Sequence, residues 1–192
     1  MLRLRDGAAE EARLNLTLEE READAPSSVN GYRRLDLDRV AALVFARATR
    51  CHELYWTKLQ KAMFFTDMVS YERNRCSLTG LTYARAPRGP IMDRMDEIRL
   101  ILVRSGAVEL QQYGWGEILI PKQMDLQPFS EDELALIDEM AAFVNTFDTS
   151  TELSDFSHLL NCWDEGVDGQ IIEYTLDDGE VGLAMREKMS AK

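Results

Sequence analysis

Cysteine, histidine and long apolar runs are scarce in this sequence of 192 residues, and each scarcity excludes a class of protein. The three cysteines, Cys51, Cys76 and Cys162, are an odd number without paired spacing, which favours free thiols over a disulfide framework. No run of about 18 apolar residues occurs, so no membrane span is predicted. The charged N-terminus lacks the apolar core of an export signal. We therefore expect a cytoplasmic protein.

Signals for catalysis or for a bound metal are equally sparse. His158 and Cys162 lie four residues apart, and the other histidine, His52, adjoins Cys51. Two such ligands do not close a zinc site, so no metal is expected. Ser157 and His158 are adjacent and would point apart on a helix, which disfavours a catalytic pair. No glycine-rich phosphate loop is present, so no nucleotide cofactor is predicted. The favoured interpretation is a non-enzymatic domain without a cofactor.

Basic residues are nearly missing from the last third of the chain. The net charge is −12, but residues 125–192 hold 3 basic and 17 acidic side chains, whereas residues 31–124 hold 15 basic and 10 acidic ones. The acidic total argues against nucleic-acid binding by this chain alone. Either the two halves pack against each other through their charges, or the acidic part is a surface for a basic partner.

The stretch 55–73 is predicted to be the central helix. Apolar side chains occur on nearly all sides of it, whereas a one-sided surface helix would leave a wide polar face. Asp67 lies among them, and a buried carboxylate needs partners. We expect a structural network in which Asp67 accepts bonds from backbone N–H groups or pairs with a basic side chain. The alternative is a general acid or base.

Further elements are predicted from periodicity and capping signals. Asp36 is a helix cap, Pro90 suits the first position of a helix, and Ser130 with Glu133 forms a capping box. Helices are expected over 37–49, from 90 to about 104, from 131 and from 150, and strands over 81–84, 108–110, 118–120 and 171–174. We expect the strands at 108–110 and 118–120 to form a hairpin and to join 81–84 in one sheet. The predicted fold is α+β, mainly helical: a buried central helix surrounded by further helices, with a small antiparallel sheet.

The chain divides into three parts by composition. Residues 1–30 are predicted to be a leader and linker, either the remnant of an upstream module or the start of a fragment of a longer protein. Residues 31–176 are predicted to form one domain. Residues 177–192 are expected to be a polar, loosely held C-terminal tail.

Three motifs resemble one known family. The run K-L-Q-K-A-M-F-F-T-D, then S-L-T-G-L-T-Y, then R-G-P-I, is similar to the signature of the Panacea domain, the SocA-like (GepA-type) antitoxin domain of bacterial and phage toxin–antitoxin systems. A later run, L-S-D-F-S-H followed by a tryptophan, is similar to the last helix of that family. The matching residues are Lys58, Leu59, Lys61, Asp67, Thr79, Gly80, Tyr83, Gly89, Pro90, Ser157, His158 and Trp163.

The resemblance implies a function. It implies an antitoxin, encoded by a bacterium or a prophage, that neutralises a cognate toxin by direct protein–protein binding. An alternative implied by the SocA branch is an adaptor that delivers a toxin to an AAA+ protease such as ClpXP. We expect the acidic last third and the aromatic residues Trp56, Tyr113 and Trp115 to contribute to the toxin contact. The sequence leaves open which toxin is bound and whether the chain forms a homodimer.

Two other hypotheses concern charged side chains. Lys58 and Lys61 are neighbours on the predicted helix, and we expect them to be solvated or capping lysines; the alternative is a basic contact with a partner or a phosphate. An enzyme of unknown chemistry would need one cleft that combines Asp67, His158 and Lys58. If these three side chains are apart or buried in packing, that hypothesis fails.

Overall fold

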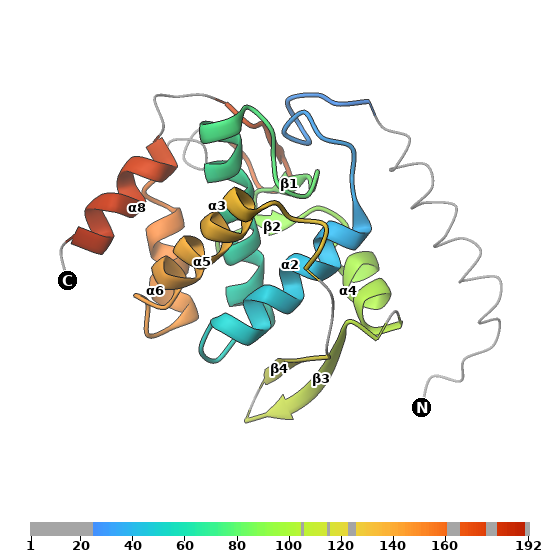
Figure 1. The fold of residues 1–192 in the computed structure, drawn as a ribbon. Coiled ribbons are helices and arrows are strands. Elements are labelled where there is room, and N and C mark those ends of the chain that lie inside the picture. Colours follow the sequence, from blue (N-terminus) through green and yellow to red (C-terminus); the bar gives the residue numbers. More distant parts are fainter. Residues whose placement is uncertain are drawn as a thin grey trace.

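A computed structural model describes residues 25–104, 106–114, 116–122, 126–160, 166–175 and 180–190. Within these ranges six helices hold about half of the residues, and two small antiparallel sheets are also present (Figure 1). The mainly helical α+β fold is therefore confirmed. The elements in chain order are α2 (Leu37–Arg50), α3 (Trp56–Asn74), β1 (Tyr83–Ala84), β2 (Ile91–Met92), α4 (Met95–Arg104), β3 (Val108–Tyr113), β4 (Gly116–Pro121), α5 (Glu131–Val144), α6 (Ser150–Ser157), β5 (Ile171–Ile172) and α8 (Glu180–Ser190).

Helix α3 is the centre of the fold, as predicted. It is buried from Lys58 to Tyr71, polar residues included, and it contacts α2, α5, α6, α8, β2 and β4. In its middle, Phe64 and Phe65 are fully buried, and Phe65 packs edge-on against Phe143 of α5. The helix ends where Arg75 takes a left-handed conformation.

The neighbouring helices begin where their capping residues predict. Asp36 accepts a hydrogen bond from Arg39 N at the start of α2, and Thr149 accepts one from Glu152 N at the start of α6. Ser130 and Glu133 form the expected capping box at α5. These caps satisfy N–H groups that a helix leaves unpaired in its first turn, so short polar motifs mark the helix starts reliably.

The sheets differ from the expectation in two ways. First, the hairpin β3–β4 forms, but it does not join β1; β1 instead pairs with β2 on one side and β5 on the other. Second, Pro90 does not start a helix, because Ile91 and Met92 pair with Ala84 and Tyr83 as strand β2. The chain then turns at Arg94, which has a positive φ, and α4 begins at Met95. Strand pairing with a buried neighbour outweighs the local helix signal of proline here.

The C-terminal segment is not a loosely held tail. Residues 180–190 form α8, in which Val181 and Met185 are buried against the core. The Glu72 carboxylate of α3 accepts hydrogen bonds of 2.8 Å from Val181 N and Gly182 N, at the start of the helix. The expectation was wrong because two apolar residues four apart suffice to dock one face of a short helix, although its other faces are polar.

The N-terminal side of the described chain is bonded to the domain. Ser28 O accepts a hydrogen bond of 2.8 Å from Tyr174 N, and Gly31 O accepts one of 2.8 Å from Ser77 N. Most of the expected leader, residues 1–24, lies outside the described residues. No described helix is long and apolar enough to cross a membrane.

Candidate functional site

The carboxylate of Asp67 is fully buried near the C-terminal half of α3, and it is hydrogen bonded on both oxygens. Oδ1 accepts from Leu78 N at 2.8 Å and from Thr79 N at 2.9 Å. Oδ2 accepts from Thr79 Oγ1 at 2.6 Å and from the phenol of Tyr83 at 2.7 Å. The expected structural network is therefore present, and it joins three motif residues of the sequence: Asp67, Thr79 and Tyr83.

Burial dominates the electrostatics of this network. Desolvation raises the pKa of Asp67 above its ordinary value, although the four hydrogen bonds act in the opposite direction. The pKa of Tyr83 is raised well above its ordinary value by burial and by the neighbouring Asp67 charge. A phenol that stays protonated remains a hydrogen-bond donor. Asp67 thus acts as an acceptor that orders the turn after α3.

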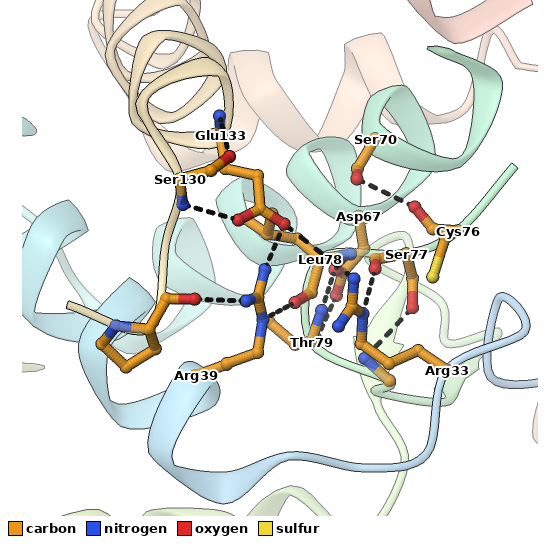
Figure 2. Close-up of polar contacts among 12 residues, drawn as sticks. Arg33, Arg39, Asp67, Ser70, Cys76, Ser77, Leu78, Thr79, Ser130 and Glu133 are labelled. Atoms are coloured by element: carbon orange, nitrogen blue, oxygen red, sulfur yellow. Dashed lines mark hydrogen bonds and ion pairs between the residues drawn. The ribbon is translucent and has the colours of Figure 1, made fainter. Parts of the chain in front are cut away.

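The turn at residues 76–80 is held from outside as well (Figure 2). Arg33 Nε donates to Ser77 O at 2.6 Å, Arg39 Nε donates to Leu78 O at 2.6 Å, and Ser70 Oγ donates to Cys76 O at 2.9 Å. The carbonyl groups of this turn are therefore paired with side chains of α2, α3 and the loop before α2.

A second part of Figure 2 links the turn to α5. Arg39 forms an ion pair with Glu133, donates to Pro128 O, and lies 4.7 Å from the centre of the Phe129 ring. Glu133 also accepts from Ser130 N at 2.9 Å in the capping box. One guanidinium group therefore connects α2, the turn after α3 and the start of α5. These contacts hold the three segments in a fixed arrangement.

Arg47 is a residue whose importance the sequence only hinted at. It is fully buried, and it donates to Ile137 O at 2.8 Å and to Thr66 Oγ1 at 2.6 Å. Burial lowers its pKa to about 10. The available signal was its position on the apolar stripe of α2, where a cation needs internal partners.

The two motif lysines were expected to be solvated or capping; both are buried, so the solvated alternative is wrong, whereas Lys58 fits the capping alternative. Lys58 is 4% exposed, and Lys61 is 1% exposed. Lys58 Nζ caps two carbonyl groups, His52 O at 3.2 Å and Phe147 O at 3.3 Å. The solvated alternative failed because helices pack against α3 on several sides, which leaves its lysines no path along which to extend into water.

Motif residues from three segments meet at the end of the Lys61 side chain. Gly89 has φ +92°, and a Cβ there would lie 2.3 Å from Ser157 Oγ and 3.2 Å from Lys61 Cε. Ser157 is buried and donates to Ser154 O at 2.6 Å. Only a glycine therefore permits the close packing of α3, the turn before β2, and α6.

The three aromatic residues expected at an interface are placed differently. Tyr113 ends β3, is 53% exposed, and contacts Tyr55 with ring centres 6.3 Å apart. Trp56 packs partly buried against the core, its Nε1 buried without a hydrogen bond, and Arg99 lies 5.8 Å from its ring centre. Trp115 lies outside the described residues, as do Cys162 and Trp163.

Lys58, Asp67 and His158, the three residues of the hypothetical catalytic cleft, take part in separate contacts. Lys58 and Asp67 are nine positions apart on α3, which corresponds to about 14 Å along a helix. Each is engaged by its own hydrogen-bond partners, and His158 is the C-cap of α6. The described residues contain no group of three or more His, Cys, Asp or Glu that could hold a metal ion. The structure therefore does not assemble the cleft that the enzyme hypothesis requires.

A family comparison decides the assignment. Residues 59–164 match the family model described as antitoxin SocA-like, Panacea domain. The chain belongs to this family. The match covers more than half of the sequence, from the first turn of α3 to beyond α6, and so includes both the Asp67 network and the Lys61 cluster of this Panacea domain. No curated protein and no solved structure matches the chain.

Membership supports a coarse functional statement. A SocA-like Panacea domain has an antitoxin-type role, which implies a toxin as its partner and suggests a role other than catalysis. Most motif residues of this Panacea domain are buried: Lys58, Lys61, Asp67, Thr79 and Tyr83 are at most 4% exposed. Their side chains therefore pack inside the domain.

Proposed function

We propose that this Panacea domain neutralises a cognate toxin by binding it directly and covering its active or target-binding face. Family membership carries the proposal. The hydrogen bonds around Asp67 and Arg39 support the proposal, because they order the domain before binding. A binding surface that is already ordered loses little conformational entropy when the partner docks. An interface of this kind typically buries more than about 1,000 Å² in total.

The β3–β4 hairpin supplies one part of the proposed toxin surface. Tyr113 is exposed at its end, and the adjacent Tyr55 supports the ring from the start of α3. Exposed tyrosine rings lose few rotatable bonds on binding and are enriched among residues that dominate interface energies. Trp56 contributes from beneath, because its indole packs against the core and Arg99.

The acidic last third of the chain supplies the other part of the proposed toxin surface. Asp155 on α6 and Glu187 on α8 are exposed, and no hydrogen bond or ion pair with another described residue engages either carboxylate. Acidic side chains that the domain does not use internally are available to a basic toxin. They would speed association through long-range attraction and lose this effect at high salt.

Co-expression with the product of the neighbouring open reading frame tests the proposal. Wild-type protein should restore growth, and Tyr113→Ala should weaken the rescue and raise the Kd about tenfold or more. Tyr32→Ala is the matched control, because Tyr32 is 51% exposed and also stacks on a tyrosine, Tyr71, but near the opposite end of α3. If no neighbouring gene product binds, the proposal is wrong.

The fate of the toxin separates two mechanisms. Occlusion leaves the toxin intact and bound, whereas an adaptor would shorten its half-life in cells that contain an AAA+ protease. The half-life should be measured by pulse-chase labelling with and without the antitoxin. A toxin that disappears only when both the antitoxin and the protease are present would replace occlusion with delivery.

A further inference from the structure

Lys61 is a buried cation without a counter-charge. Its side chain is 1% exposed, and no described residue forms a hydrogen bond or an ion pair with its Nζ. Lys58, one turn earlier, shows the usual solution, because its ammonium donates to two carbonyl oxygens. An ammonium group that is largely removed from water without such partners destabilises the folded chain.

The described surroundings of Lys61 offer it no acid. The turn that contains Gly89 and the hydroxyl-bearing residue Ser157 lie against the end of its side chain. The nearest carboxylate on its own helix, Asp67, is six residues on, and both oxygens of Asp67 already accept hydrogen bonds. Ser157 Oγ donates its hydrogen to Ser154 O.

A second cation adjoins Lys61. Arg88 is exposed on the turn that Gly89 N closes by donating to Ala86 O at 2.9 Å. Its charge acts on Lys61: the pKa of Lys61 is lowered to about 8, mainly by burial and further by Arg88. No ion pair within the described residues engages Arg88 either. Within the described residues, two neighbouring cations, one buried and one at the surface, therefore have no anion as a partner.

We propose that Lys61 and Arg88 form an anion-binding site that receives a carboxylate side chain of the toxin. Arg88 binds the carboxylate at the surface, and the Lys61 ammonium stabilises it from beneath the turn at residues 86–89. The two positive charges select an acidic side chain of the partner. This inference rests on the proposed function for its partner, while the site itself is a property of the free domain.

The free chain provides the first test. Lys61→Met keeps the length and the apolar stem of the side chain but removes the charge. If Lys61 awaits an anion, this variant should raise the Tm by roughly 2–5 °C, since the desolvation cost disappears. Sodium acetate and sodium phosphate should each raise the Tm of the wild type above that in sodium chloride of equal ionic strength, and neither should do so for Lys61→Met.

Two results in the free chain overturn the inference. A lower Tm for Lys61→Met would show that the ammonium stabilises the fold through internal contacts. A shift with phosphate but none with acetate would show a phosphate site in place of a carboxylate site.

The complex provides the second test. Lys61→Met and Arg88→Gln should each weaken toxin binding about tenfold to a hundredfold in calorimetry. Arg104→Gln is the matched control, because Arg104 is an exposed arginine with no ion pair in the described part of the chain. Replacement of each toxin Asp or Glu by its amide should identify one residue whose effect is not additive with Lys61→Met.

The outcomes keep the two proposals apart. If wild-type protein binds no toxin, the proposed function fails, and the salt-dependent Tm of the free chain still decides whether an anion site exists. If toxin binds wild type and both variants equally well, the proposed function stands and the carboxylate site is wrong.

Discussion

The phenol of Tyr83 donates a 2.7 Å hydrogen bond to Oδ2 of Asp67, and this bond ties strand β1 to the central helix. Tyr83 is fully buried and packs edge-on against Phe64, with ring centres 5.3 Å apart. It also pairs with Met92 and Ile172 on the two neighbouring strands. One side chain therefore couples the three-stranded sheet to α3.

Tyr83→Phe should lower the free energy of unfolding by about 1.5–3 kcal/mol, because the hydrogen bond it removes has a carboxylate acceptor. Tyr174→Phe is the matched control: its phenol is also fully buried but donates to a neutral carbonyl, Leu81 O, at 2.8 Å. The control should cost only about 0.5–1.5 kcal/mol. Urea denaturation measures both, and equal losses would mean that the Asp67 charge adds nothing.

Asp67→Ala should be more damaging than either tyrosine variant, at about 3–5 kcal/mol. It leaves the N–H groups of Leu78 and Thr79 buried without an acceptor. Asp67→Asn retains one acceptor oxygen for these N–H groups and should recover part of the loss. A hydrogen-exchange experiment should show lost protection at residues 78 and 79 in the alanine variant, and unchanged protection there would contradict the role assigned to Asp67.

Gly89→Ala should destabilise the domain by more than Gly106→Ala. Both glycines have positive φ, so both alanines carry backbone strain of about 1 kcal/mol. At Gly89 the new Cβ also meets Ser157 Oγ at 2.3 Å, whereas nothing lies within 4 Å at Gly106. Thermal unfolding should therefore give a Tm drop at least twice as large for Gly89→Ala. Similar drops would show that the contact with α6 relaxes freely.

Stability should rise with pH between about 8 and 10.5 through Lys61. Its pKa is lowered from 10.5 to about 8 in the folded chain, mainly by burial. In that range the unfolded chain binds more protons than the folded one, so the free energy of unfolding increases with pH. Below pH 8, the charged Lys61 lowers the free energy of unfolding by about 3 kcal/mol relative to its neutral form. Because tyrosines and other lysines also titrate there, the measured quantity is the difference in slope between wild type and Lys61→Met.

That difference should be positive across the range and vanish below pH about 7, where Lys61 is protonated in both states. Parallel curves for the two proteins would exclude a perturbed amine at position 61.

Helix α8 should contribute to stability through Met185. This side chain is fully buried, so Met185→Ala should cost about 2–4 kcal/mol. Leu183→Ala is the control on the same helix, because Leu183 is 49% exposed, and it should cost less than about 0.5 kcal/mol. If both variants lose the same free energy of unfolding in denaturant titrations, residues 180–190 are a loosely held tail.

Local signals predicted what local physics controls. Asp36 and Ser130 marked helix starts correctly, because a cap acts within one helical turn. Apolar residues on all sides of 55–73 predicted a buried central helix, and the described α3 is buried along 14 successive residues. The need of a buried acid for donors predicted a network at Asp67, though its donors could not be named from spacing alone.

Non-local pairing escaped prediction. Pro90 carries a helix signal, yet Ile91 and Met92 pair with β1, and the hairpin stays separate from that sheet. Lys58 and Lys61 have stems long enough to reach water, but the helices packed on α3 bury them. The short apolar pattern of α8 was too weak to stand out from its charged neighbours.

By itself the sequence determined the helical frame, the buried centre and the family, because each depends on residue type at short spacing or on a motif read along the chain. Only the tertiary structure decided which motif residues meet. It placed Tyr83 and Thr79 on Asp67, and it brought Gly89 and Ser157 to Lys61 from segments 28 and 96 residues further along the numbering. The reason is physical: a contact between distant segments depends on how whole elements pack, and no periodicity within one element records it.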